Sequence, residues 1–228
     1  MTSNNSAPPA GRSGLSLLKA SPVTVTLAAL CTLVWLVEQV ATLAGWQSVQ
    51  VFIGYEMAMI PARLTGLLVW PDAVIPAILT PITMMFVHGG LGHLGLNMLF
   101  LLVIGRFPEG ILGSGRYLAL YFASGIAGAL LEVALHPDSL VPYVGASGAI
   151  AGVIGAHAMI FGQRDGKDSE KKRALQLAGV WIVIQVLTGI VFNSGGGDGG
   201  IAIWAHVGGF LTGLALGVPL AKDAIARR

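Results

Sequence analysis

The chain has few charged residues and a single cysteine, and each shortage excludes a class of protein. Asp, Glu, Lys and Arg together make up 11% of the 228 residues, too few to cover the surface of a water-soluble domain of this size. Cys31 is the one cysteine and lies in an apolar run, so an intramolecular disulfide framework is excluded and a packed thiol is expected. Hydrophobic residues account for 54% and glycine for 32 residues, a composition typical of closely packed membrane helices.

Apolar runs divide the chain into predicted membrane spans. Six of them are long enough to cross or nearly cross a bilayer, at residues 23–44, 86–105, 116–134, 147–162, 174–193 and 201–221. We expect residues 1–21 to be a disordered tail, 22–221 to form one domain and 222–228 to be a second short tail. The predicted fold class is therefore an all-α membrane protein, a bundle of six transmembrane helices.

The segment 51–70 is also apolar, but its composition argues against a seventh span. It carries Glu56, Pro61 and Arg63, and it ends at Trp70, a residue type that favours the headgroup region. We predict that the first outer loop contains a membrane-associated insertion here.

The basic residues predict the orientation of the bundle. With six spans and an inside N-terminus, the inside segments contain Arg12, Lys19, Arg106, Arg116, Arg164, Lys167, Lys171, Lys172, Arg173, Lys222, Arg227 and Arg228. Only Arg63 of the 13 Lys and Arg residues falls outside, and one span more or fewer would destroy this asymmetry. We expect both termini in the cytoplasm, most simply at a bacterial inner membrane. The acid-free, basic N-terminal tail leaves a mitochondrial transit peptide open on composition.

Five polar side chains lie in segments that should be buried in lipid. They are His88, His93, Asn97, Ser147 and His206. Intramembrane polar groups are costly and are functional candidates by default. In the six-span topology, all five lie in the outer third of the bilayer. His93 and Asn97 are four residues apart and therefore share one helix face.

Ser147 begins the fourth span, between Gly145 and Gly148, which allow a tight turn and a close backbone approach. Its backbone N–H lies at a helix N-terminus, where unpaired donors and the helix dipole favour an anion. The span 147–162 covers roughly 24 Å at ~1.5 Å per residue, less than the ~30 Å hydrocarbon layer. Ser147 is therefore expected below the outer surface, in a cavity that water enters from outside.

Glycine spacing in the last span predicts how a base reaches Ser147. Gly209, Gly213 and Gly217 form two overlapping GxxxG units close to the face of His206. Such small-residue faces let two membrane helices approach closely. This packing would bring the Ser147 hydroxyl within hydrogen-bond reach of His206, and a serine attacks poorly without such a base.

These segments resemble the rhomboid intramembrane serine proteases. The similarity rests on HGGLGHLGLNM, on GASG, on AHVGGFLTG, and on PEGILGSGRYLALYFASGIAG between them, and it runs from about residue 61 to 217. Each motif alone is weak, but their order and matching depth are specific. The resemblance implies a Ser–His dyad without a catalytic acid, with Ser147 as nucleophile and His206 as general base. The oxyanion and supporting residues it implies are His88, His93, Asn97 and Gly145.

The resemblance also implies partners and cofactors. The substrates would be single-span transmembrane proteins in the lipid bilayer, cut near their outer ends. No metal, nucleotide or other cofactor and no nucleic acid is expected. One position departs from the pattern: Ala151 stands where many members carry an aromatic residue stacked on the catalytic histidine. Something else must then orient His206.

Other functions compete with this reading. A catalytically weak or inactive rhomboid-like binding protein, or a small transporter, is the main alternative. A zinc protease would use His88, His93 and His206 as ligands, but an HExxH motif is absent. An aspartyl protease would need a second intramembrane acid to pair with Asp198, which lies in an outer loop.

Overall fold

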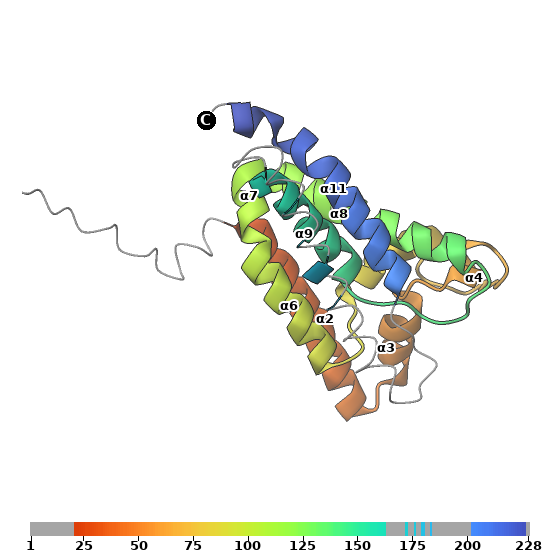
Figure 1. Ribbon diagram of the computed structural model, residues 1–228. Coiled ribbons are helices and arrows are strands. Elements are labelled where there is room, and N and C mark those ends of the chain that lie inside the picture. Colours follow the sequence, from red (N-terminus) through yellow and green to blue (C-terminus); the bar gives the residue numbers. More distant parts are fainter. Residues whose placement is uncertain are drawn as a thin grey trace, which may run out of the picture.

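Helices account for nearly all regular structure in the part of the chain that the computed structural model describes, residues 21–162 and 202–226 with isolated positions between 172 and 183. The α-helices are α2 Pro22–Ala44, α3 Gln47–Val51, α4 Pro61–Leu64, α5 Thr80–Thr83, α6 Leu91–Ile104, α7 Arg106–Leu112, α8 Ser114–Leu135, α9 Ser147–Gly162 and α11 Ile203–Ala226 (Figure 1). A π-helical turn, η1, spans Phe52–Glu56, and the 3₁₀ turns η2 and η3 span Ala77–Leu79 and Met84–Phe86.

Three of these helices, α2, α8 and α11, are long and apolar enough to cross a membrane. A fourth span is formed if the bent pair Ala77–Phe86 and Leu91–Ile104 counts as one, and α9 is a shorter apolar helix of 16 residues. The prediction of an all-α membrane bundle is confirmed. Five predicted spans correspond to α2, α6, α8, α9 and α11, and the predicted span 174–193 lies outside the continuously described residues.

The second span begins later than predicted. The sequence predicts one helix over 86–105, but α6 starts at Leu91. The chain bends by 82° between the segment Ala77–Phe86 and this helix. Gly89 and Gly90 stand at the break, and glycine is a poor helix former, so the chain turns there. His88 therefore precedes the helix that carries His93 instead of lying on it.

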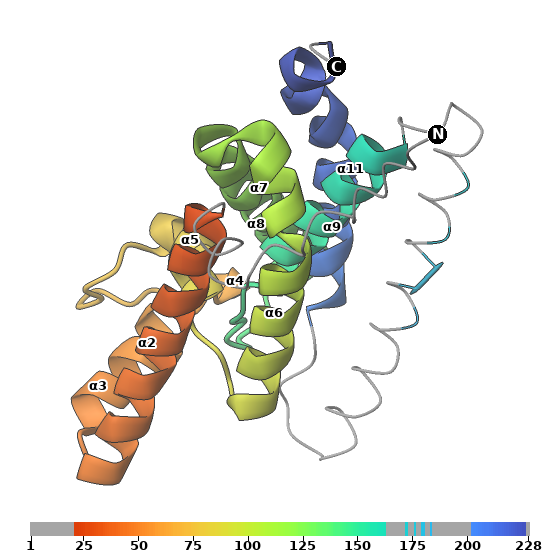
Figure 2. The same ribbon diagram turned by 90° about the vertical axis from the view of Figure 1, so that its left-hand side faces the viewer.

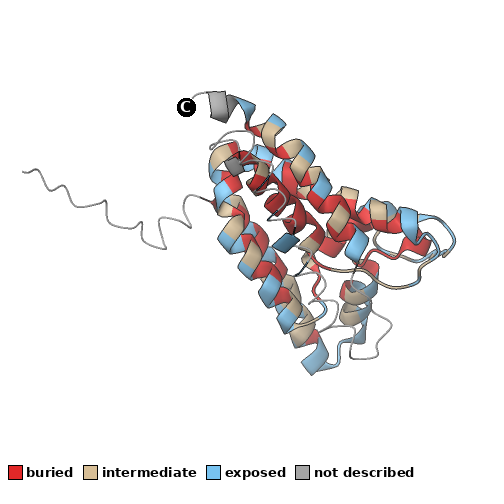
Figure 3. Cartoon of the chain, in the orientation of Figure 1, coloured by how far each residue is buried: buried red, intermediate tan, exposed pale blue. Residues whose placement is uncertain are grey.

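Helix α9 packs against both α8 and α11, which also pack against each other, and lies at the centre of the bundle (Figures 1 and 2). Its residues from Gly148 to Ala156 are all buried, and the inward faces of the surrounding helices are buried as well (Figure 3). A helix that is apolar on every side is expected where other helices surround it. The candidate serine is thus at the end of the most enclosed helix.

The loop between α2 and α6 folds into short helical turns, and no single helix spans 51–70. Buried Arg63 donates a hydrogen bond of 2.7 Å to the carbonyl of Ile75, and its guanidinium lies 4.9 Å from the centre of the Trp70 ring. The carboxylate of Glu56 accepts hydrogen bonds from the N–H groups of Val74 and Ile75. Arg63 is therefore bound inside the loop, which explains how one cation is tolerated on the predicted outer side. Membrane association of this loop stays a prediction.

A second buried carboxylate anchors the start of α2. Glu109 of α7 accepts hydrogen bonds of 2.8 Å from the N–H groups of Val23 and Thr24 and one of 2.7 Å from the Thr24 hydroxyl. These amides belong to the first turn of α2, where no intrahelical acceptor exists. Glu109 thus ties α7 to the first span.

Candidate active site

Ser147 and His206 lie in direct contact. Nε2 of His206 on α11 is 2.5 Å from Oγ of Ser147, the first residue of α9. His206 is buried and Ser147 is half-buried. The close packing of the two helices therefore joins residues 59 positions apart in the sequence.

The turn into α9 is fixed by backbone geometry. Gly145 has φ of +123°, which L side chains rarely adopt, and its N–H donates to the carbonyl of Met84 at 2.9 Å. The first intrahelical bond of α9 follows at once, from Ile150 N–H to the carbonyl of Ala146. The N–H of Ser147 is one of the amides at the helix start that have no intrahelical acceptor.

His93 lies beside this turn. A β-carbon built at Gly145 would stand 2.7 Å from Nε2 of His93 and 3.7 Å from Oγ of Ser147. Glycine at 145 therefore leaves room for the His93 ring next to the serine. His88 is buried at the break before α6, and its ring centre is 5.1 Å from that of His93. The structure thus gathers Gly145, both histidines and the serine at one end of the bundle.

Asn97 is placed less directly. It is buried one turn after His93 on α6, as the spacing predicts, and its side-chain N–H donates to the carbonyl of His93 at 3.0 Å. This hydrogen bond is made within its own helix, so the observed contact of Asn97 is with the His93 backbone and not with Ser147.

Glycines hold α9 and α11 in backbone contact. A β-carbon on Gly209 would collide with the carbonyl oxygen of Gly148, and one on Gly213 would collide with that of Gly152. Ala151, between these contacts on α9, is buried with no ring to place against His206. The two backbones are therefore in direct contact about one and two turns beyond His206.

Sequence reasoning missed Glu132 as a component of this region. Its carboxylate, on α8, accepts a hydrogen bond of 3.2 Å from the N–H of Ala205, the residue before His206. The available signal was an acid near the outer end of a membrane span, a costly feature that marks functional candidates.

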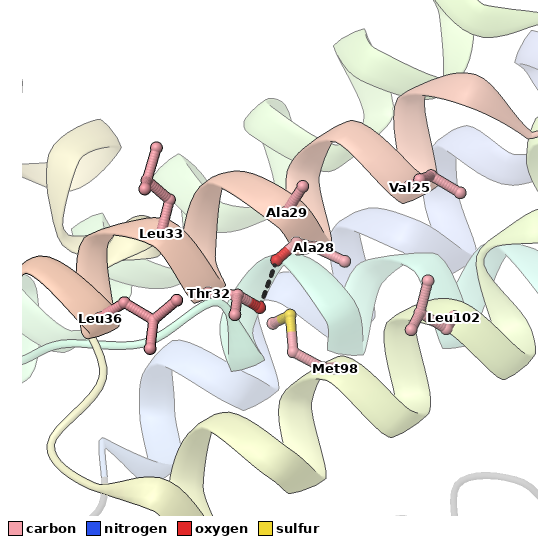
Figure 4. Close-up of a pocket in the computed structure, with 8 residues that line it drawn as sticks. All are labelled: Val25, Ala28, Ala29, Thr32, Leu33, Leu36, Met98 and Leu102. Carbon is pink, nitrogen blue, oxygen red and sulfur yellow. Dashed lines mark hydrogen bonds between the residues drawn. The ribbon is translucent and has the colours of Figure 1, made fainter.

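The described residues contain no group of three His, Cys, Asp or Glu side chains placed to hold a metal ion. The zinc alternative therefore lacks a ligand cluster in this part of the chain. A groove of about 500 Å³ between α2 and α6 is also separate from the serine (Figure 4). Its lining is Val25, Ala28, Ala29, Thr32, Leu33, Leu36, Met98 and Leu102, and the Thr32 hydroxyl donates within its own helix to the carbonyl of Ala28.

Comparison with known proteins identifies the family. The family model described as the rhomboid domain matches residues 77–223, and this chain belongs to that family. The resemblance drawn from the sequence is thereby confirmed. Together with the apolar helices, family membership makes the chain an integral membrane protein.

Curated relatives come from distant organisms. "Rhomboid protease GluP" of Bacillus subtilis is 34% identical over 151 residues, which cover 63% of this chain and 26% of that protein. "Rhomboid-like protease 3" of Toxoplasma gondii is 33% identical over 135 residues, 59% of this chain and 49% of the relative. Human "Rhomboid-related protein 3" is 28% identical over 182 residues, which cover 72% of this chain and 41% of the relative. The chain thus spans between about a quarter and a half of the length of these relatives.

Proposed function

We propose that this protein is an intramembrane serine endopeptidase that cleaves transmembrane segments of single-span membrane proteins near the outer face of the bilayer. The observation that carries the proposal is the 2.5 Å contact between Nε2 of His206 and Oγ of Ser147. Two of the relatives carry the word protease in their names, which supports the same reaction class.

The proposed reaction uses the pair twice. As Oγ of Ser147 attacks the scissile carbonyl carbon, the hydroxyl proton passes to Nε2 of His206. The tetrahedral intermediate collapses when the histidine gives this proton to the leaving nitrogen, so the C–N bond breaks and an acyl-enzyme remains. A water molecule then attacks the acyl carbon and gives a proton to Nε2 of the same histidine. The histidine passes this proton to Oγ of Ser147 as the acyl C–O bond breaks, which releases the acid product and restores the pair. The proton transfers of both steps use only the pair, water and substrate.

The oxyanion would be held by donors around the start of α9. The N–H of Ser147 is available by its position in the first turn. His93 lies beside the serine across Gly145, and Asn97 contacts the His93 backbone. We assign His93 and Asn97 to the oxyanion hole, and His88 and Gly145 to support of the His93 ring.

The proposed setting follows from the charge pattern and the length of α9. The domain would comprise residues 22–221, between a tail over 1–21 and one over 222–228, with both termini in the cytoplasm of a bacterial inner membrane. The 16 residues of α9 are shorter than the hydrocarbon layer, so Ser147 would lie below the outer surface. Water would reach the serine from outside.

Labelling with a fluorescent fluorophosphonate tests the proposal on purified, detergent-solubilised protein. The wild type should be labelled, with the adduct on Ser147 by mass spectrometry, and Ser147→Ala should not be. The matched control is Ser124→Ala, which removes a buried serine of α8 outside the pair and should label like the wild type. An inactive binding protein or a transporter would show no labelling of Ser147.

Cleavage of a model single-span substrate tests the pair as a unit. Ser147→Ala and His206→Ala should each abolish cleavage, and the double variant should be no worse, because residues that act together are not additive. Cleavage should be insensitive to metal chelators. Full activity of Ser147→Ala, or loss of activity with a chelator, would contradict the serine mechanism.

A further inference from the structure

Glu132 joins the two segments that carry Ser147 and His206. Its side chain is 2% exposed, near the end of α8. One carboxylate oxygen, Oε2, accepts the hydrogen bond from Ala205 N–H, and the other, Oε1, lies 2.7 Å from Nδ1 of half-exposed His136. A single side chain therefore contacts the first turn of α11 and the start of the loop that leads to α9.

The same carboxylate also reaches the middle of that loop. The Tyr143 side chain lies near it, and the pKa of Tyr143 is raised, mainly by burial and further by the nearby Glu132 charge. Tyr143 is four residues before Ser147, and its backbone is paired with that of Met59 through hydrogen bonds of 2.8 and 3.0 Å. The loop that leads to Ser147 is thus contacted by both Glu132 and the backbone of Met59.

The contact with Ala205 has a clear physical basis. Ala205 is the third residue of α11, where a backbone N–H has no partner within the helix. An anion is favoured at that end by the helix dipole. A buried carboxylate is costly without partners, so its retention here indicates a specific contact.

The carbonyl group of Ala205 is held by close packing against α8. A β-carbon on Gly128, one turn before Glu132 on α8, would collide with the carbonyl oxygen of Ala205. Gly128 and Glu132 therefore meet the C=O and the N–H of Ala205 from one helix face. His206 is the next residue, and Ala151 supplies no ring against which its imidazole could be oriented.

We infer that Glu132 is a positioning residue for the proposed reaction, one that holds the first turn of α11 and the loop before α9 so that His206 and Ser147 meet. This inference rests on the proposed function. Glu132 acts on the pair through Ala205 and the loop and does not touch the reacting atoms.

The experiment compares Glu132→Leu, Glu132→Gln and Glu109→Leu in the full-length purified protein. The leucine variant removes the acceptor, whereas glutamine keeps an oxygen for Ala205 and an N–H for the neutral form of His136. Glu109 is the matched control because it is equally buried, at 2% exposed, and also binds amides at a helix start, but that of α2. The measurements are kcat and KM on a model substrate, thermal stability, and hydrogen exchange of the segment 202–210.

We expect Glu132→Leu to lower kcat about 100-fold at nearly unchanged KM, the effect of a displacement of ~1 Å. Glu132→Gln should recover most of that loss. Glu109→Leu should lower thermal stability and leave kcat of the folded protein intact. Exchange over 202–210 should rise in Glu132→Leu and not in Glu109→Leu. Equal kcat for both leucine variants, or unchanged exchange at the start of α11, would overturn the inference.

Two further comparisons keep the test decisive. If Glu132→Leu does not fold, Glu132→Asp replaces it in the test. Aspartate keeps the charge but is one methylene shorter, so the kcat of Glu132→Asp should fall below that of Glu132→Gln. A higher kcat for Glu132→Asp would contradict the inference, because the charge and not the hydrogen bond to Ala205 would then matter. If Ser147→Ala cleaves like the wild type, the proposed function fails. The exchange of 202–210 then still decides whether Glu132 holds α11.

Discussion

The carbonyl oxygen of Gly152 on α9 lies where a β-carbon on Gly213 of α11 would stand. The two backbones are in contact at this point, about two turns below His206. Any side chain at position 213 must separate the helices. We therefore expect the distance between α9 and α11 to decide whether His206 reaches Ser147.

Gly213→Leu should therefore nearly eliminate cleavage while the protein remains folded. A displacement of ~1 Å at the site can cost about 100-fold in rate. The measurement is turnover of a model membrane substrate by the purified variant, with thermal unfolding followed alongside. Wild-type turnover by folded Gly213→Leu would show that another contact orients His206.

Gly217→Leu is the matched control for that prediction. A β-carbon there would stand 2.8 Å from Cα and 3.0 Å from Cβ of Ala156, a looser contact one turn farther from the pair. We expect a smaller loss of turnover than in Gly213→Leu. A larger loss would place the critical contact at the inner end of α11.

Asn97→Ala should lower kcat less than Ser147→Ala does. Removal of one oxyanion donor costs ~10²–10³ in rate when other donors remain. If Asn97 acts partly by holding the His93 backbone, to which it donates at 3.0 Å, a double variant with His93→Ala should lose less than the product of the single losses. The measurement is kcat of the two single variants and the double variant; multiplying losses would show that the two side chains act independently.

Much of the candidate site was readable from the sequence because its signals are local. Polar residues in apolar runs marked Ser147 and His206, and the spacing of Gly209 and Gly213 indicated the helix contact that joins them. The length of the apolar runs likewise predicted most helix bounds to within a few residues.

The remaining features depend on contacts between distant segments. The chain turns before Leu91, so His88 lies off the helix, and hydropathy does not report such a bend inside an apolar run. The partner of Glu132 is a backbone amide 73 residues away, on another helix. Every residue except proline has a backbone amide, so no sequence motif could predict which amide binds Glu132.

Glu109→Leu should destabilise the fold without acting on the reaction. It leaves the N–H groups of half-buried Val23 and buried Thr24 without their acceptor at the start of α2. A buried donor left unsatisfied costs about 1–3 kcal/mol, so the free energy of unfolding should fall by at least that amount. Glu109→Gln, which keeps one acceptor oxygen, should lose less. Equal stability of the leucine variant and the wild type, measured by thermal unfolding in detergent, would show that α2 does not depend on this link.

The orientation of the bundle is testable at the C-terminus. The predicted inside segments hold every Lys and Arg except Arg63, and that side chain is bound within its own loop by the carbonyl of Ile75. A reporter that is active only outside the cytoplasm, fused after Arg228, should therefore be silent, and one that is active only inside should work at the same position. An insertion of each reporter beside Asp138, in the loop before α9, should give the opposite pair of results.

Activity of the outside reporter after Arg228 would mean that the number of spans is odd or the orientation reversed. If the whole bundle is inverted, Ser147 faces the other compartment, and the insertion beside Asp138 should also give reversed results. If there is one extra span after the loop, the insertion should give the results expected here.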